Sequence, residues 1–553
     1  MSTNDRRPYL TSTTLDQTFL NNCADNLVCQ LELVVEIQTP DGVINASDRN
    51  KYVGETFYEA LLKFPTINRT VGDWLSNVLE FSVLELELSN ADGRFNKYVP
   101  GGASFDGWIG KSVEVKLGLR DVASTYRTVF RGKVTEVGGF SRSVRSVTVI
   151  ARDVYDQLTV SIPPSVFTRD AYPDMEDGIE GLGIPVIRDN WTTDLTDPAV
   201  VPAFVVNGAN ANVIGGTRNN VQCVVTEQPL DSFDSTKVYL VRASNFFLLA
   251  AADIVSVGVD DNNFQVKQNG ASSIDGVPYE FESGDQFYCH VTSGNDNIVT
   301  QAAWLLEQFG GLTSGDFDSN WTTYTTALSS IKSRLWIQEG QSLMEYVLSM
   351  FEQVRLEAFI SIDQKIRISS LRFEDLDPSP SFTIKNWDVE RESFQPQIDD
   401  RNNFNRAQAA YNLEPSSGEE TRRTSIYKNA AAIAQVGKAI SKQIVFPNLY
   451  VEAQVTTELT NILKLASAYS EQVTLSVTWR SLLLELGDMV FLNVAIGASV
   501  FENVPCLVRA IGYDPNGLKI NLTLWSFQMT PYAGYTPTYS GIVGGSTATI
   551  TVE

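Results

Sequence analysis

The C-terminal part of the chain has the alternation of apolar and polar residues that is typical of half-buried β-strands. Val473–Trp479 alternates, Leu482–Leu486 is apolar, and Gly487-Asp488 breaks the run. Met489–Val494 then starts another strand, and Val504–Ile511 and Leu518–Trp525 form a hairpin across the turn Asp514–Gly517. This pattern predicts a β-meander.

A similar meander is predicted near the other end of the chain, from Val113 to Leu158. Short strands precede it, each with its apolar residues on one face, and several such strands favour a small barrel or sandwich. The strands and their apolar positions are Leu31, Leu33, Val35 and Ile37; Leu84, Leu86 and Leu88; Val113, Val115, Leu117 and Leu119; Val129–Val134; and Val144–Ala151.

Helical periodicity appears at three places. The first helix is expected over Ile298–Phe309, ending at Gly310-Gly311. The second follows an expected capping box, Ser342–Glu345, and leads into a hairpin of Arg355–Ser361 and Lys365–Phe373. The third is expected over Thr457–Ser470, with Leu459, Ile462, Leu463, Ala466 and Tyr469 facing inward.

These elements predict a mainly β protein with a few helices, composed of two small β-barrel domains and an inserted all-β domain. The expected divisions are an N-terminal arm, 1–24; a first β-barrel, 25–164; an acidic inserted β-domain, 165–297; a helix-hairpin α+β region, 298–386; a second β-barrel, 387–529; and a C-terminal tail, 530–553.

The net charge of −24 argues against nucleic acid or an anionic membrane as a surface partner. More than half of this charge lies between Arg169 and Asn297, where 19 Asp and Glu face 6 Lys and Arg. No apolar run is long enough for a membrane helix, and the first residues lack the apolar segment of a secretory signal.

Catalytic chemistry finds little support in the sequence. His290 is the single histidine, and it lies in an alternating stretch beside Cys289, which must point to the opposite face of the strand. The five cysteines are expected to be reduced and buried: Cys23, Cys29, Cys223, Cys289 and Cys506. We therefore predict no catalytic residue, no cofactor and no metal site, and hence no enzyme.

Two acidic clusters, Glu374–Asp377 and Asp260–Asn263, are expected to be solvated turns. Either cluster could alternatively bind Ca²⁺ through its side-chain oxygens. The insert also contains aromatic residues that could stack on sugars but are more simply core residues. They are Trp191, Phe246, Phe247, Tyr279 and Tyr288.

Three blocks together resemble the tail hub proteins of bacteriophages, which continue the tail tube at its tip. They are Phe130–Val134 with Ser146–Asp153 and Leu158; Ser342–Phe373; and Asn405–Tyr411 with Leu486–Val490. In the last block Ala407 stands where a β-branched residue is expected after Arg406.

The resemblance implies a structural protein of the virion, a homotrimer whose two barrels per subunit form a ring of six. Such a hub joins a hexameric tail tube or distal tail protein above to a trimeric spike below, with a tape measure protein as a further partner. It lines the channel through which DNA passes without being specifically bound, and it is assembled in the host cytoplasm. The alternative function from the sequence is a glycan- or receptor-binding tail protein that acts through the insert.

Overall fold

The computed structural model describes residues 31–552 apart from several internal segments. These are 64–66, 71–82, 99–101, 104–106, 121, 142–144, 192–200, 212–218, 244, 257–261, 362, 372–381, 400–402, 416–417, 468, 498, 515–518 and 529–549. The arm 1–24, Cys23, Cys29, the cluster Glu374–Asp377, Asp260 and most of the tail lie outside the described residues. The described chain is mainly β, which confirms the fold class.

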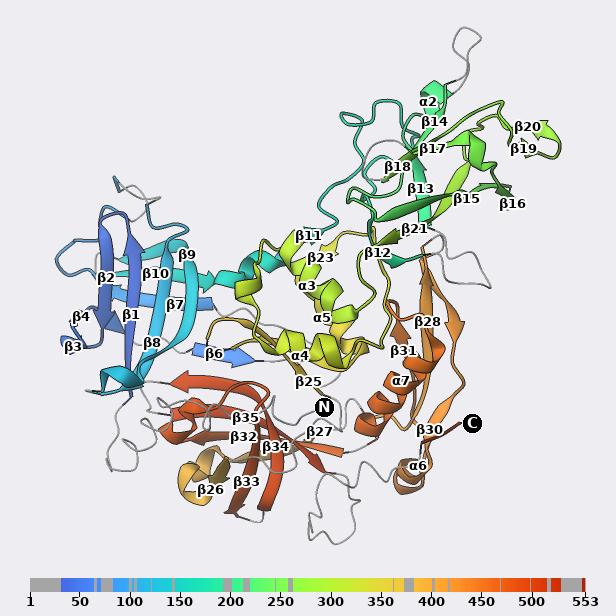
Figure 1. Cartoon of the computed structure of the whole chain (residues 1–553). Helices are drawn as coiled ribbons and strands as arrows, with labels where there is room; N and C mark the ends of the chain where they lie inside the picture. Colours follow the sequence, from blue (N-terminus) through green and yellow to red (C-terminus); the bar gives the residue numbers. More distant parts are fainter. Residues whose placement is uncertain are drawn as a thin grey trace.

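The first sheet is antiparallel over most of its width (Figure 1). Its strands, in spatial order, are β3 (Lys51–Val53), β4 (Thr56–Ala60), β2 (Gly42–Ser47), β1 (Leu31–Thr39), β8 (Ser112–Leu119), β9 (Arg127–Ser141), β10 (Ser146–Asp153), β7 (Val83–Ser89) and β5 (Leu62–Lys63). The apolar faces predicted from alternation are buried: Leu33, Val35 and Ile37 on β1 are fully covered.

The second sheet lies beside the first in Figure 1 and repeats part of its topology. Its strands, in spatial order, are β26 (Thr383–Lys385), β33 (Met489–Ile496), β34 (Ser499–Asp514), β35 (Lys519–Gln528), β32 (Tyr469–Val477) and β27 (Gln395–Asp399). In each sheet one continuous segment pairs with both ends of the path. In the first, β4 pairs with β2, β5 pairs with β7, and Leu61 between them bonds to Ser47 of β2 and Ser89 of β7. In the second, β26 pairs with β33, and Val389 and β27 further along the segment pair with β32. The two sheets therefore close in the manner of the expected barrels.

A group of helices and short strands lies beside the two sheets (Figure 1). It comprises β11 (Ser161–Ile162), α3 (Ile298–Gln308), α4 (Asn320–Ala327), β23 (Gln341–Ser342), α5 (Leu343–Gln353), β24 (Leu356–Ile360) and β25 (Ile366–Ser370), with short 3₁₀ turns at Val154–Thr159 and Ser314–Asp316. The stripes expected on α3 and α5 are buried. The expected capping box is wrong, because Ser342 makes no side-chain cap bond and instead pairs in β23 with Ser161.

An additional sheet, which the sequence pattern did not predict, is formed by strands of the region 387–529 together with one strand of the C-terminal tail. It consists of β28 (Arg406–Glu414), β29 (Glu419–Arg423), β30 (Tyr427–Asn429), β31 (Ser441–Phe446) and β36 (Ile550–Val552), with helices α6 (Ala430–Val436) and α7 (Glu452–Ala466). Helix α7 begins before the expected Thr457 and ends before Ser470, because Tyr469 already belongs to β32.

The end of the chain departs from expectation. The C-terminal tail, 530–553, is short of large aliphatic residues, so its sequence predicts that only a neighbouring subunit can order it. For Ile550–Val552 this is wrong, because these residues pair with β30 of the same chain.

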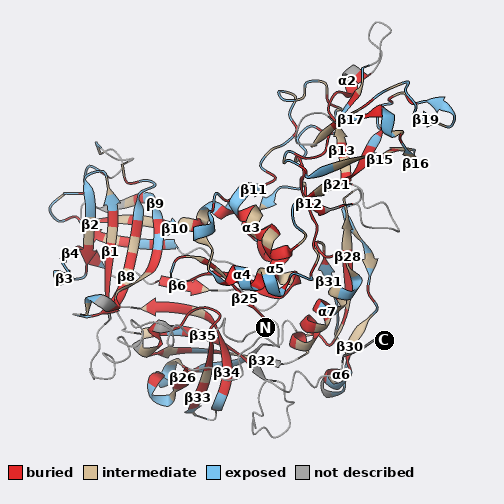
Figure 2. Cartoon of the chain, viewed as in Figure 1, coloured by how far each residue is buried: buried red, intermediate tan, exposed pale blue. Residues whose placement is uncertain are grey.

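The insert has its own core, separate from the continuous core of the other parts. Its strands are β12 (Val186–Asn190), β13 (Val201–Val205), β14 (Val221–Val224), β15 (Ser232–Arg242), β16 (Asn245–Leu248), β17 (Ile254–Ser256), β18 (Asn263–Val266), β19 (Ser273–Ile274), β20 (Val277–Pro278) and β21 (Gln286–Ser293), with a short helix α2 (Gly208–Ala211). Strand β12 also pairs with β22 (Leu335–Ile337) of the helical region. The insert projects from the rest of the molecule, and its strands alternate between buried and exposed positions (Figure 2).

Candidate assembly site

The two main sheets contain the same arrangement of five strands. In the first copy, which we define as β5, β7, β8, β9 and β10, the spatial order is β8-β9-β10-β7-β5. In the second copy, β27, β32, β33, β34 and β35, the order is β33-β34-β35-β32-β27. Every neighbouring pair is antiparallel in both copies, and the strands follow one another in the same sequence order. The chain therefore carries an internal structural repeat.

The long middle strand has two β-bulges at matching places in each copy. In β9 the extra residues are Val129, opposite β8, and Thr135, opposite β10. In β34 the first bulge includes Asn503, opposite β33, and the second is Arg509, opposite β35. The two bulges are six positions apart in both strands. Because bulges bend and twist a strand, this shared placement supports a common shape for the two copies.

Gly132 shows why the block Phe130–Val134 needs its glycine. A Cβ on Gly132 would lie 2.2 Å from the backbone oxygen of Arg152 on the neighbouring strand. Any side chain at this position would push β9 and β10 apart. The motif residue is thus explained by a close backbone approach.

Strand β6 (Ile67–Thr70) comes from the first domain but pairs with the second copy. It runs antiparallel to β34, with Ile67 opposite Tyr513 and Thr70 opposite Ala510. These β34 residues pair with β35 on their other side, so β6 occupies the same edge as β33, beyond the point where β33 ends. The first domain therefore completes the second copy by giving it a strand.

The equivalent edge of the first copy pairs with no other strand of the described residues. Residues Lys133 and Gly132 of β9 pair with both β8 and β10, whereas Glu136–Gly138 pair with β10 alone among the described strands. When β9 and β34 are aligned at their shared bulges, Glu136–Gly139 correspond to Ala510–Tyr513. The latter are the residues that pair with β6. An unpaired strand edge exposes N–H and C=O groups that can pair with another chain.

The junction of the second copy contains buried charges. Arg509, the bulge residue of β34, forms an ion pair with Glu357 of β24, whose side chain is fully buried. Arg367 Nη1 lies 3.2 Å from Glu485 Oε2 in the same region. On β6, the Arg69 side chain donates to the carbonyl oxygen of Ile360. These contacts hold the second copy against the central helices and hairpin.

The residues considered for chemistry lie apart from this junction. His290 is a buried residue of β21, and burial lowers the pKa of its imidazole. Cys223, Cys289 and Cys506 are free and buried, and burial raises the pKa of each thiol. No group of three or more His, Cys, Asp or Glu residues that could hold a metal occurs in the described part of the chain. None of its described helices is long and apolar enough to cross a membrane.

The aromatic candidates of the insert are mainly core residues. Trp191, Tyr279 and Tyr288 are buried, and Phe247 is partly buried against the insert core. Phe246 is 58% exposed and is the one member of the set that reaches the surface. The structure therefore does not bring these five residues together as a stacking platform.

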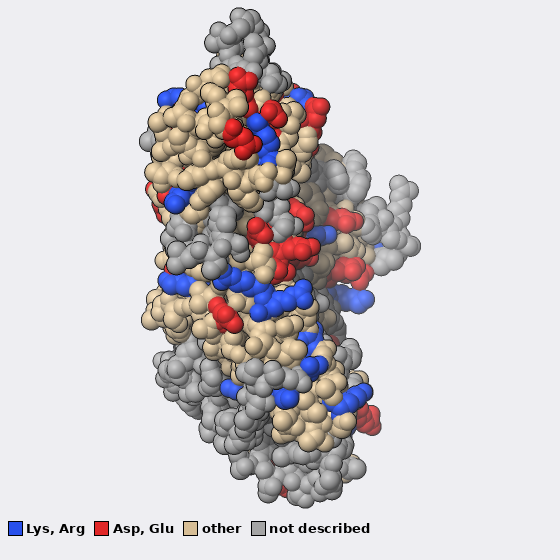
Figure 3. Space-filling model, turned by 90° about the vertical axis from the view of Figure 1, so that its right-hand side faces the viewer, with Lys and Arg blue, Asp and Glu red and all other residues tan. Residues whose placement is uncertain are grey.

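Charge is unevenly arranged on the face shown in Figure 3. Asp and Glu cluster on and just below the insert, and Lys and Arg form a band lower down. The additional sheet carries exposed basic residues, including Arg423 on β29 and Lys442 on β31. Opposite charges on adjacent zones of one surface favour oriented contacts with neighbouring proteins.

No protein-family model and no curated protein matches the chain. Solved structures similar to it include a tail protein from Neisseria meningitidis, with a TM-score of 0.42 and 10% identity, covering 89% of this chain and 96% of that one. A 43 kDa tail protein of prophage MuSo2 from Shewanella oneidensis gives a TM-score of 0.39 and 10% identity, covering 90% and 98%. An Escherichia coli component of the type VI secretion system gives 0.30 and 9%, covering 92% and 77%.

These structures are tail proteins and a component related to the T4 tail proteins gp27 and gp5. They are the kind of protein that the sequence resemblance indicated. All three TM-scores are below 0.5.

Proposed function

We propose that the chain is a structural component of a phage-type tail, a trimeric hub ring at the tail tip or baseplate. The observation that carries this proposal is strand β6, which passes from the first domain into the second copy of the repeat. In a ring of like domains, each domain would pass a strand to the next one. One such transfer takes place within the chain, and the open edge of β9 is the place where the next would arrive.

The transfer between chains follows from the repeat. Strand β6 lies between β5 and β7 in sequence, so its counterpart is expected between β27 and β32. That segment of one subunit would pair with Glu136–Gly139 of the next. Such a head-to-tail contact gives a closed ring if the rotation closes. The number three comes from the family resemblance, since three chains with two copies each present six similar domains to a hexameric tube.

The same proposal assigns the partners. The ring would join a tail tube or distal tail protein to a spike or central fibre protein, with a tape measure protein inside during assembly. DNA would pass through the channel without specific binding, in agreement with the net charge of −24. The hub would belong to the virion, be assembled in the bacterial cytoplasm and have no catalytic activity of its own.

Proline substitutions at the open edge test the ring. Glu136–Gly138 keep a regular register with β10, so successive N–H groups there point to opposite sides. One of Val137→Pro and Gly138→Pro therefore removes a donor from the open edge, and the other removes a donor that faces β10. The expected result is that the variant with the smaller loss of thermal stability, relative to its alanine control, loses the trimer, measured by native mass spectrometry. The matched controls Val137→Ala and Gly138→Ala should remain trimeric. A trimer that survives both proline substitutions would overturn strand addition at β9.

A second candidate function, recognition of a glycan through the insert, is favoured by one specific observation. The insert contains a cavity of about 600 Å³, and six of its fourteen described lining residues are Asn or Gln.

A further inference from the structure

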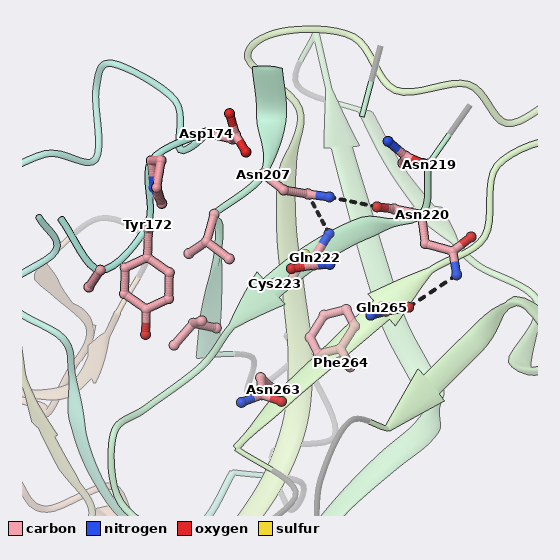
Figure 4. Close-up of a pocket in the computed structure, with 14 residues that line it drawn as sticks. Tyr172, Asp174, Asn207, Asn219, Asn220, Gln222, Cys223, Asn263, Phe264 and Gln265 are labelled. Atoms are coloured by element: carbon pink, nitrogen blue, oxygen red, sulfur yellow. Dashed lines mark hydrogen bonds between the residues drawn. The ribbon is translucent and has the colours of Figure 1, made fainter. Parts of the chain in front are cut away.

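The amide-lined cavity of the insert lies on the outer face of β14 and β18, next to the loop Ala171–Asp174 (Figure 4). Its volume of about 600 Å³ is in the ordinary range for small-ligand pockets. The lining side chains that carry amides are Asn207, Asn219, Asn220, Gln222, Asn263 and Gln265. So dense a set of amides in one hollow is unusual for a surface, where charged residues normally prevail.

The register of the two strands explains how the floor forms. Gln222 of β14 lies opposite Gln265 of β18, and Val224 lies opposite Asn263. Successive side chains of a strand point to opposite faces, so these four share the outer face. The intervening residues, including Cys223 and Phe264, are buried in the insert core. One face of the strand pair thus holds the domain together and the other presents amides.

Part of the amide set is used to build the site. Asn207 donates from Nδ2 to the carbonyl oxygen of Asn220 at 2.8 Å and accepts from the backbone N–H of Gln222 at 2.7 Å. Asn220 Nδ2 donates to Gln265 Oε1 at 3.1 Å. These bonds fix the floor and leave the other polar atom of each of the two bonded amides, Asn220 and Gln265, for a ligand.

Two groups remain unused within the described part of the chain. Asn263 Oδ1 is buried and has no hydrogen-bond partner, although its Nδ2 donates to Asn262. A buried carbonyl oxygen without a partner costs free energy, which a donor from a ligand would recover. The exposed side chain of Gln222 also has no hydrogen bond to a described residue. One acceptor and one donor–acceptor group are therefore available on the same floor.

The side chains that form the walls of the cavity restrict the chemical class of the ligand. Among the described lining residues, Asp174 is the one that carries a charge. Tyr172 and Pro173 supply an apolar wall, with the half-buried Tyr172 ring held against Phe167 at 5.7 Å between centroids. Anionic ligands are disfavoured by Asp174 and by the acidic composition of the insert. Uncharged molecules with many hydroxyl groups and an apolar face match this combination.

We propose that this cavity binds a neutral saccharide unit of about two sugar rings. Amide side chains donate and accept at once, so they can bond to vicinal hydroxyls, and Tyr172 offers a ring face to the C–H side of a sugar. The site differs from the aromatic set named from the sequence. It also does not depend on the ring, because the insert has its own core and projects from the molecule (Figure 1).

The full chain is titrated with a defined panel of uncharged oligosaccharides: maltotriose, mannotriose, galactotriose and chitotriose. Trigalacturonate serves as the anionic comparison. Binding is measured by calorimetry and by saturation-transfer NMR, and the double variant Gln222→Ala/Asn263→Ala is compared with Asn245→Ala, an exposed amide on β16 at the other edge of the sheet. We expect at least one neutral trisaccharide to bind, a loss of about tenfold or more in the double variant, and no change in Asn245→Ala.

Three results would overturn the proposal: no neutral member binds, the double variant binds as well as the parent, or trigalacturonate binds more tightly. Because removal of a buried amide can unfold a domain, Gln222→Ala alone is measured as well. Its exposed side chain leaves the core untouched, so it must weaken binding with an unchanged melting temperature. The oligomeric state of each variant, measured in parallel, separates a failure of this site from a failure of the hub.

Discussion

The two copies of the repeat have the same order of strands and share two bulge positions, but their surroundings differ. In the second copy the bulge residue Arg509 is buried and paired with Glu357, and strand β6 covers the edge beyond it. In the first copy the corresponding residue Thr135 is exposed, and the edge beyond it has no described partner. One copy is completed within the chain, and under the proposed assembly a partner would complete the other.

The two copies therefore share a strand topology although the residues at equivalent positions have different roles. A bulge places its extra side chain on the bent part of the strand, where it can point to a neighbour. The second copy uses that position for a buried ion pair with the central hairpin. The first copy carries a small polar residue there, which suits an edge that must stay accessible until assembly.

The largest expected effect is on the buried ion pair. Arg509→Met removes the partner of Glu357 and leaves a charge inside the protein, which typically costs about 3–5 kcal/mol. Thr135→Ala, at the equivalent bulge, should change stability by less than about 0.5 kcal/mol. Both are measured by scanning calorimetry on the full chain.

The double variant Arg509→Met/Glu357→Leu is the control for this prediction. It replaces both charges by apolar groups, so most of the lost stability should return. Equal losses in Arg509→Met and Thr135→Ala would show that the two bulges are equivalent after all.

A smaller effect is expected at Asp153, which ends β10 of the first copy and lies near Arg69 of β6. Burial raises the pKa of this carboxyl from 3.8 to about 6. The folded state therefore holds the proton more strongly than the unfolded state. The resulting stability is fully present below about pH 4 and is lost as the pH rises through 6, by at most about 3 kcal/mol.

Asp153→Asn should remove this loss, because an amide has no charge to bury and can still accept from Tyr155 N–H, now at 2.9 Å. The expected result is a variant more stable than the parent near neutral pH but not near pH 4. Melting temperatures across this range measure it. A parent protein whose stability rises from pH 4 to 7 as much as that of the variant would contradict the assignment to Asp153.

The smallest effect concerns Ile67, a buried residue of β6. Ile67→Val should cost about 0.5–1.5 kcal/mol. Since β6 contacts the second copy, hydrogen exchange should become faster at Ala510–Tyr513 of β34 and stay unchanged at Val147–Ala151 of β10. Faster exchange in β10 instead would assign β6 to the first copy.

Much of the local structure follows from the sequence. The alternation in β1, β7 and β8 and the stripes of α3 and α5 identify the buried residues, because one solvated face leaves a clear period. Cys289 and His290 occupy opposite faces of one strand, as their adjacency predicts. The capping box at Ser342 failed because that residue is engaged in a strand pair with Ser161, a contact far away in sequence.

The parts that carry the proposed function could not be predicted in this way. Strand β6 is four residues long, and nothing in Ile67–Thr70 indicates which sheet it joins. The repeat was visible as two meanders, but its strand order depends on pairings between segments distant in the chain. The amide cavity joins Tyr172, Asn207, Gln222 and Asn263, which no local period connects. Such features depend on tertiary contacts, for which a single sequence has no signal.

The most direct test of the central claim is a cryo-electron microscopy reconstruction of the assembled protein. We predict a closed ring of three chains with six similar sheets. In this ring, Glu136–Gly139 of each β9 pair with a strand of the next chain, in the same way as Ala510–Tyr513 pair with β6 within one chain. A different number of chains, or a threefold ring in which this edge of β9 meets no strand from a neighbour, would contradict it.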